Sequence, residues 1–255
     1  MSLHIEVVGS GPALVLIHGW ALHGGVFAPL VDRLAAQYQL HLVDLPGHGF
    51  SHDDATPLRL PHVVNAIAAA TPPAVWCGWS LGGLFALHAA ATLPQVRAVV
   101  MIAATPRFVR GDDWPHAVEP AVFEQFGQDL AQDYRGSLER FLALDAMGSE
   151  HARQELRTLR EMLIARGEPA ARALQEGLRL LENSDLRGAL AGLGKPSLWL
   201  AGARDRLVSA RAMQAAATLA PGAQAHVIAQ GGHAPFLGHT DAVATQLQHF
   251  VAGLP

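Results

Sequence analysis

Short runs of continuously apolar residues recur along the first 106 residues of the chain, and stretches of helical length separate them. Strands that are apolar at every position are typical of a parallel sheet that helices cover on both faces. The alternation of strand and helix predicts such a sheet with right-handed crossovers, which is the α/β class. The predicted strands cover residues 13–17, 40–43, 74–77 and 96–102, and the predicted helices lie near 26–36, 61–70 and 81–92.

Residues 107–187 differ from the rest of the chain in charge. They hold 11 arginines and 15 acids, which is 26 of the 40 formal charges. Leucines recur here at helical spacing, and four helices are predicted near 119–133, 136–147, 150–166 and 169–183. Strands at 197–200 and 225–228 and helices at 209–219 and 240–252 then resume the earlier order. We therefore expect a core of residues 1–106 and 188–255, with a four-helix cap of residues 107–187 inserted in it.

The composition argues against several classes of function. The net charge of −4 gives no basic excess for nucleic acid and no cationic cluster for a membrane surface. The first eight residues lack the basic start and apolar run of a signal peptide, and no apolar stretch approaches the roughly 18 residues of a membrane span. The single cysteine, Cys77, permits no internal disulfide, which fits a reducing compartment. We expect a cytoplasmic monomer that binds neither nucleic acid nor a membrane.

The strongest local motif is Gly78-Trp79-Ser80-Leu81-Gly82, which follows a predicted strand and opens a predicted helix. That context is typical of the nucleophile elbow of serine hydrolases, where the serine lies on a strained turn. Glycines two residues to either side relieve the crowding of that turn. A Gly-rich turn in a βα unit also explains this pattern taken alone. Other residues must distinguish a catalytic serine from a simple turn. A serine nucleophile needs a base to take its proton and an acid to orient that base.

In this kind of hydrolase the acid follows the serine in the chain, and the histidine follows the acid. Beyond the predicted cap the candidate acids are Asp205 and Asp241. Asp205 follows a predicted strand closely, whereas Asp241 comes after the best histidine candidates and suits the N-terminus of a helix. His233 lies in a Gly-rich loop after the last predicted strand, with His239 as the runner-up. The predicted catalytic triad is Ser80, His233 and Asp205.

An acyl-transfer site also needs two N–H donors for the oxyanion. One is the backbone N–H after the nucleophile, which belongs to Leu81, and the other comes from the loop after an early strand. Trp20, in His18-Gly19-Trp20, is the natural second donor, and its side chain either lines the pocket or packs in the core. The chain has no paired cysteines, no HExxH and no Walker lysine, since its only lysine is Lys195. We expect neither a metal nor a cofactor.

Together these motifs resemble the α/β-hydrolase superfamily along nearly the whole chain. Within it, the chain is similar to the pimeloyl-[acyl-carrier protein] methyl ester esterase (BioH) family. The core motifs are widely shared; the tryptophan before the nucleophile, Trp20 after His-Gly, and the Arg-Phe-Leu-Ala-Leu run in the cap discriminate better. The stretches that carry the likeness are residues 16–20, 40–47, 78–84, 139–144 and 233–236.

The resemblance implies hydrolysis of the methyl ester of a pimeloyl group on acyl-carrier protein, in biotin synthesis. It also implies which residues contact the substrate: Trp20, Leu81 and the cap run Phe141, Leu142, Ala143, Leu144 and Asp145. Position 145 is acidic in this chain, where the resemblance leads us to expect a neutral amide.

The carrier protein is acidic, so the face of this chain that binds it should be basic. Arg140 matches the cap motif of the family, and three further arginines share one face of a predicted helix, namely Arg153, Arg157 and Arg160. We expect these four to dock the carrier protein. The alternative is a solvated face on which the arginines pair with Glu150, Glu155 and Glu161.

Two other functions fit parts of the sequence. A broad-specificity short-chain carboxylesterase would use the same triad, because the triad does not encode the acyl group. A hydrolase-fold binding protein without turnover is the alternative of another class, and the intact set Ser80, Asp205 and His233 argues against it. Labelling by a fluorophosphonate separates the enzyme from the binding protein.

Overall fold

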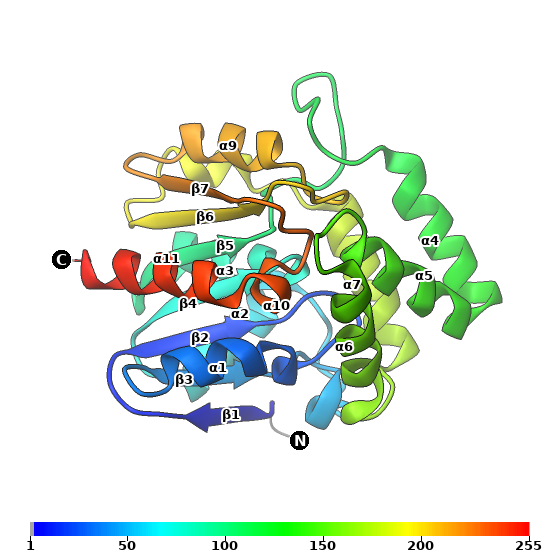
Figure 1. Ribbon diagram of the computed structural model, residues 1–255, viewed down its shortest axis with the longest axis horizontal. Helices are drawn as coiled ribbons and strands as arrows, with labels where there is room; N and C mark the ends of the chain where they lie inside the picture. The colour runs from blue at the N-terminus through cyan, green and yellow to red at the C-terminus, as the bar shows by residue number, and fades with distance from the viewer. Residues whose placement is uncertain (1–2, 255) are drawn as a thin grey trace.

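A twisted seven-stranded sheet forms the centre of the computed structural model, which describes residues 3–254 (Figure 1). The strands lie in the order β1-β3-β2-β4-β5-β6-β7, and only β1 runs antiparallel to its neighbour. The predicted α/β fold with a mostly parallel sheet is confirmed. The strands are β1 (Ile5–Val8), β2 (Ala13–Ile17), β3 (Gln39–Val43), β4 (Ala74–Trp79), β5 (Val96–Ile102), β6 (Ser197–Gly202) and β7 (Gln224–Ile228).

The edge strand β1 was absent from the sequence-based prediction. It is only four residues long, includes the charged Glu6, and none of its residues is fully buried. The prediction relied on continuous apolar runs, which identify strands that are covered on both faces. An edge strand that packs partly against solvent lacks this signal.

Helices cover both faces of the sheet, as the α/β pattern requires. Helix α1 (Ala28–Leu34) packs against α11 (Thr240–Ala252) on one face, and α2 (Leu60–Ala70) packs against α3 (Leu81–Thr92) on the other (Figure 1). Helix α9 (Ala210–Leu219) packs on β6 and β7. Short turns complete the core: η1 (Gly24–Phe27), η2 (Gly49–Ser51) and α10 (Pro235–Gly238).

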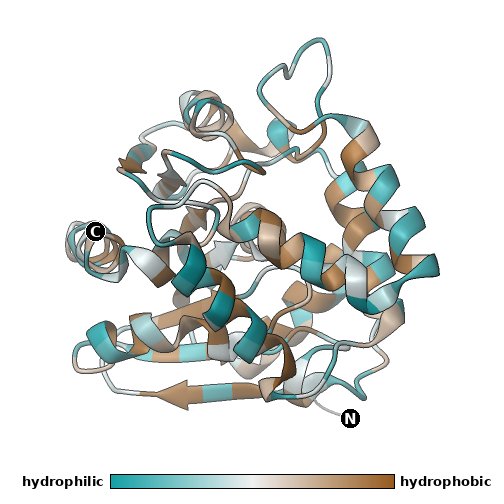
Figure 2. Ribbon diagram, turned by 45° about the vertical axis from the view of Figure 1, so that its right-hand side comes forward, coloured by the Kyte–Doolittle hydropathy of each residue, from teal (hydrophilic) through white to brown (hydrophobic). Residues whose placement is uncertain are grey.

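Five helices lie between β5 and β6 in the chain; the first four gather at one end of the sheet, whereas the fifth contacts α9 (Figure 1). Hydrophilic and hydrophobic residues alternate along them (Figure 2), because one side of each helix packs inward. Four of them begin and end within two residues of the predicted positions, and the four-residue α8 is too short to give a periodic signal. They are α4 (Pro120–Gln132), α5 (Tyr134–Ala146), α6 (Ala152–Ala165), α7 (Ala171–Asn183) and α8 (Arg187–Leu190).

The inserted helices are tied to the core by polar contacts as well as by apolar packing. The backbone N–H of Ala170 donates to the carbonyl of Gly47 at 2.8 Å. Arg166 forms an ion pair with the buried Asp44 at 3.2 Å and with Glu6 at 2.5 Å. Since Asp44 is inaccessible to solvent, this pairing compensates part of its desolvation.

None of the helices formed by residues 3–254 is both long and apolar enough to span a bilayer.

Candidate active site

Ser80 occupies a sharp turn between β4 and α3, with φ +52° and ψ −121°. A residue with a side chain adopts such a φ only when its surroundings hold it there. A Cβ on Gly78 would clash with the carbonyl of Gly82, and a Cβ on Gly82 would clash with the carbonyl of Ile17. The two glycines therefore allow β4, the turn and α3 to pack closely. This geometry presents Ser80 at the carboxyl end of the sheet.

The three residues predicted as the triad lie in one hydrogen-bonded chain. His233 Nε2 is 2.8 Å from Ser80 Oγ, and His233 Nδ1 is 2.8 Å from Asp205 Oδ2. The other oxygen of Asp205 accepts hydrogen bonds from the backbone N–H groups of Leu207 and Val208. These bonds hold the carboxylate still, so that it can orient the imidazole. The arrangement allows His233 to take the proton of Ser80 as the hydroxyl attacks a carbonyl carbon.

Buried surroundings and nearby acids act on His233 in opposite directions. Burial by itself lowers the pKa of this histidine, because it disfavours the imidazolium ion. The charge of Asp205, its hydrogen bond and the charge of Asp145 together outweigh burial, so the pKa of His233 lies above its ordinary value. These acids stabilise the imidazolium that forms during proton transfer.

The alternative acid and base lie elsewhere in the structure. Asp241 is exposed in the first turn of α11 and pairs with Arg33 at 2.5 Å. The ring of His239 lies beside that of His151, with 5.2 Å between centroids. The structure brings neither of them to Ser80.

The predicted oxyanion donors flank the nucleophile. Leu81 is the first residue of α3, where backbone N–H groups have no partner within the helix. A Cβ on Gly19 would lie 3.2 Å from the Cβ of Ser80, so the loop that carries Trp20 passes directly beside the serine. The Trp20 side chain is buried, and its Nε1 donates to the carbonyl of Leu174 in α7 at 2.9 Å. It thus links the core to the inserted helices.

The run from Phe141 to Asp145 lies on α5, and its last residue is hydrogen-bonded to the backbone of His233. Phe141 packs on Trp20 with 4.6 Å between ring centroids. Leu142 is also buried, whereas Ala143 and Leu144 are half-buried. The run therefore does not present all five side chains equally to Ser80.

Asp145 is the residue of this run where we had expected a neutral amide. Its side chain is inaccessible to solvent, and neither carboxyl oxygen has a hydrogen-bond partner in residues 3–254. Oδ1 lies 3.9 Å from His233 Nε2, and the carbonyl of Asp145 accepts the backbone N–H of His233 at 3.2 Å. Burial raises the pKa of Asp145 to about 7; the charge of His233 lowers it and that of Asp205 raises it.

The four arginines predicted to dock a carrier protein are exposed, and three have acidic neighbours. Arg140 pairs with Asp129 and Asp133 at 3.3 and 3.4 Å. Arg157 pairs with Glu161 and Arg160 with Glu139, while Arg153 lies in the first turn of α6. Such exposed pairs are weak and exchange readily with other partners.

Glu155 departs from the solvated-face alternative, under which it would have paired with an arginine. It is buried, and its Oε1 accepts a hydrogen bond from Ser149 at 2.6 Å. Burial raises its pKa. The burial of Glu155 could not be predicted from helical periodicity. It results from the segment Pro235–Gly238, which is distant in the sequence and packs against this turn of α6.

Among residues 3–254, one group of side chains could hold a metal ion. Single ligand atoms of Glu150, His151 and His239 lie within 4.8 Å of one another, although Glu150 and His151 are exposed. The group joins the start of α6 to the end of α10. The ester chemistry of Ser80 and His233 runs through other atoms, so we give this group no part in it.

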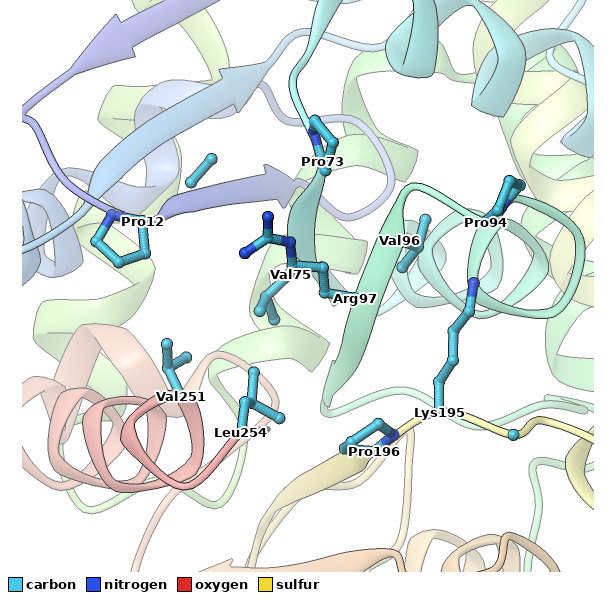
Figure 3. Close-up of a pocket in the computed structure, with 12 residues that line it drawn as sticks. Pro12, Pro73, Val75, Pro94, Val96, Arg97, Lys195, Pro196, Val251 and Leu254 are labelled. Atoms are coloured by element: carbon cyan, nitrogen blue, oxygen red, sulfur yellow. The ribbon is translucent and has the colours of Figure 1, made fainter.

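A pocket of about 620 Å³ lies at the amino ends of the strands, far along the sheet from the triad (Figure 3). Arg97 and Lys195 are its cationic residues, and Lys195 donates to the carbonyl of Leu93 at the end of α3. Ligands of open α/β sheets bind at the carboxyl ends of the strands. Size alone therefore does not make this pocket the active site.

Comparison with known proteins decides the family. The model of the alpha/beta hydrolase fold family matches residues 12–240. The chain belongs to this family. It is 79% identical to a pimeloyl-[acyl-carrier protein] methyl ester esterase of Stenotrophomonas maltophilia (strain R551-3), over 99% of this chain and 97% of that protein. It is 76% identical to the protein of the same name from Xanthomonas campestris pv. campestris (strain B100), over 99% and 100%.

Solved α/β hydrolases share the fold at much lower sequence identity. The esterase EaEST from Exiguobacterium antarcticum superposes with a TM-score of 0.89 at 21% identity, over 98% of this chain and 96% of that one. The arrangement of core and inserted helices is thus one that the hydrolase family tolerates with very different sequences. The resemblance inferred from the sequence motifs is confirmed.

The raised pKa of His233 predicts the pH dependence of ester hydrolysis. The base must be neutral, so kcat/KM should fall as the pH drops through a pKa above 6.5, the ordinary value for histidine. Asp205→Asn should lower turnover by about 10³–10⁴-fold and move this limb to lower pH, because it removes both the charge and the carboxylate hydrogen bond. The check is a pH profile of kcat/KM on p-nitrophenyl acetate. A wild-type limb at or below 6.5 would contradict the electrostatic assignment.

Proposed function

We propose that the chain is a serine esterase that hydrolyses the methyl ester of a pimeloyl group carried on acyl-carrier protein, in biotin synthesis. Two observations together support this proposal. The chain is 79% identical over nearly its full length to an esterase of that name, and Ser80, His233 and Asp205 are linked by hydrogen bonds. The substrate class comes from the relatives, and the chemistry comes from the geometry.

The reaction proceeds in two halves. Ser80 Oγ attacks the ester carbonyl carbon while His233 Nε2 takes the hydroxyl proton. The resulting oxyanion accepts hydrogen bonds from the backbone N–H groups of Trp20 and Leu81. His233 then protonates the departing methoxy oxygen, and methanol leaves an acyl ester on Ser80. Water attacks this ester, gives a proton to His233, and the C–Oγ bond breaks as that proton returns to Ser80. The product is the free pimeloyl carboxyl group.

We also propose that residues 107–187 act as a cap on a core of residues 1–106 and 188–255. The inserted helices cover the triad, since Ser80 is 3% exposed and His233 only 1%. Trp20, Leu81 and the run Phe141 to Asp145 then form the wall that a substrate meets. A long acyl chain on a carrier arm must displace part of this cap to place its ester at Ser80.

The carrier protein binds the cap through Arg140, Arg153, Arg157 and Arg160. These arginines lie on α5 and α6; α5 also carries Asp145, which contacts His233, and α6 packs against α5. Their acidic neighbours belong to exposed pairs, which a dense acidic surface can replace. Several weak charge pairs acting together steer association and are screened by salt.

The first test replaces the nucleophile. Ser80→Ala should lower the hydrolysis of pimeloyl-[acyl-carrier protein] methyl ester by several orders of magnitude, because it removes the hydroxyl that is paired with His233. His233→Ala should be similarly damaging, and the double variant little worse than either. The measurement is methanol release together with the mass of the carrier protein.

Ser184→Ala, at the C-cap of α7, is the matched control and should keep wild-type rates. Circular dichroism verifies that each variant is folded. Near-normal turnover by Ser80→Ala would refute the assignment of the nucleophile, and simple multiplication of the two single losses would show that Ser80 and His233 do not act together.

The second test reverses charge on the cap. Replacing Arg140, Arg153 and Arg157 by Glu should raise KM for the carrier-linked ester and leave hydrolysis of a free small ester nearly unchanged. Added salt should weaken the wild type on the carrier substrate more than it weakens the variant.

The matched control for that test makes the same charge change on the core, at Arg59, Arg97 and Arg211, which are exposed. It should affect the carrier substrate much less than the cap variant does. Equal losses on both substrates in the cap variant would mean that the cap had been destabilised. Unchanged KM for the carrier substrate would remove the docking surface.

A further inference from the structure

Asp145 is a buried carboxyl group that the two-step mechanism above does not use. Burying a carboxyl without partners is costly, and such groups are rare in folded proteins. Both of its oxygens lie unpartnered within the described residues, and Oδ1 is 3.9 Å from the catalytic nitrogen of His233. The cost makes sense if a group that arrives during the reaction supplies the missing hydrogen bond.

Asp145 does not duplicate Asp205. Asp205 Oδ2 lies 2.8 Å from Nδ1 of His233, whereas Asp145 Oδ1 lies 3.9 Å from Nε2. Nε2 is the nitrogen that exchanges protons with Ser80 Oγ, at 2.8 Å. Asp145 therefore stands on the side of the ring where the reacting oxygens lie, not on the side where the ring is oriented.

The chemistry of the substrate limits what can bind to this carboxylate. The oxygens of an ester accept hydrogen bonds and donate none, and the ester carbonyl belongs to the oxyanion donors. The O–H donors that the reaction brings to Nε2 are the departing alcohol and the incoming water. The alcohol receives its proton from His233 and leaves, whereas the water must be held before it attacks.

The distance between the two acceptors suits one water molecule. A water that hydrogen-bonds at about 2.8 Å to each of two atoms can bridge atoms 3.9 Å apart with an acceptable angle. One of its protons would point to His233 Nε2 and the other to Asp145 Oδ1. In that position its oxygen lies next to the acyl ester on Ser80.

We propose that Asp145 is a catalytic residue of the second half-reaction, where its carboxylate holds the water that hydrolyses the acyl ester on Ser80. The water oxygen bonds to the acyl carbon, its proton moves to His233 Nε2, and the C–Oγ bond breaks as Oγ takes that proton. Asp145 keeps the second water proton in a hydrogen bond and is unchanged at the end. This inference rests on the proposed esterase function.

The electrostatic setting supports this role. Burial raises the pKa of Asp145 to about 7, with His233 and Asp205 as the titratable groups that act on it. At pH 7 about half of the Asp145 side chains are therefore ionised, and this fraction rises with pH. As His233 takes the proton from water, the new positive charge favours the ionised form of Asp145 further.

The backbone also couples this side chain to the base. The carbonyl of Asp145 accepts the N–H of His233, and a Cβ on Gly232 would lie 3.5 Å from that carbonyl oxygen. Asp145 thus sits on the cap but is fixed relative to the loop that carries the base. When the cap is closed, the water-binding carboxylate and the base are held at one separation.

The test separates the two half-reactions on p-nitrophenyl acetate by stopped flow. The initial burst of p-nitrophenol reports acylation of Ser80, and the steady state reports deacylation. Asp145→Leu should keep the burst rate within about threefold and slow deacylation about tenfold or more. Acetylated Ser80 should then accumulate, as mass spectrometry of the quenched enzyme and its peptides would show.

Asp145→Asn provides a second variant of nearly the same shape, whose amide oxygen can still accept a hydrogen bond from water. It should slow deacylation less than Asp145→Leu does and leave acylation unchanged. Glu139→Gln is the matched control, since it removes a charge from an exposed position of the same helix; both phases should stay at wild-type rates.

Equal slowing of both phases in Asp145→Asn, or wild-type deacylation in Asp145→Leu, would overturn the inference. Its failure is distinguishable from failure of the proposed function. If the wild-type enzyme forms no acetyl ester on Ser80 at all, the serine esterase mechanism itself is wrong. If wild-type Ser80 is acetylated and deacylation ignores Asp145, only the water-binding role is lost.

Discussion

The strained turn at Ser80 is the constraint on which the rest of the site depends. Its φ of +52° is possible because Gly78 and Gly82 let β4, the turn and the start of α3 approach the end of β2. The same contact brings the loop of Gly19 and Trp20 beside the serine. One packing arrangement therefore brings together Ser80, the N-terminus of α3 and the loop of Trp20, which we propose as the second oxyanion donor. Any side chain at either glycine would separate them.

The inserted helices also contact the residues around this turn. Three contacts tie them to the reacting groups: the bond from Trp20 to Leu174, the packing of Phe141 on Trp20, and the bond from His233 to Asp145. The cap thus touches the oxyanion loop on one side and the base on the other. Burial of the reacting groups strengthens their electrostatic interactions. In the mechanism we propose, the Asp145 carboxyl binds the one water that the reaction consumes.

Much of this could be predicted from the sequence because the strongest signals are local. Ser80 lies in a five-residue motif, and Ser80, Asp205 and His233 occur in the chain order that is typical of this kind of hydrolase. The edge strand β1 and the burial of Glu155 could not be predicted, since both depend on what packs beside them. Asp145 was predicted to contact substrate, but its solitary carboxyl 3.9 Å from His233 emerges only when α5 and the loop after β7 are placed together.

We propose that Ser80 of this chain carries out the ester hydrolysis that biotin synthesis requires. Growth of a biotin auxotroph that lacks its own pimeloyl-[acyl-carrier protein] methyl ester esterase tests it directly. Expression of the wild-type chain should restore growth without biotin, and an equal amount of folded Ser80→Ala protein should not. Failure of the folded wild-type chain to restore growth, or full rescue by Ser80→Ala, would show that Ser80 does not perform this hydrolysis.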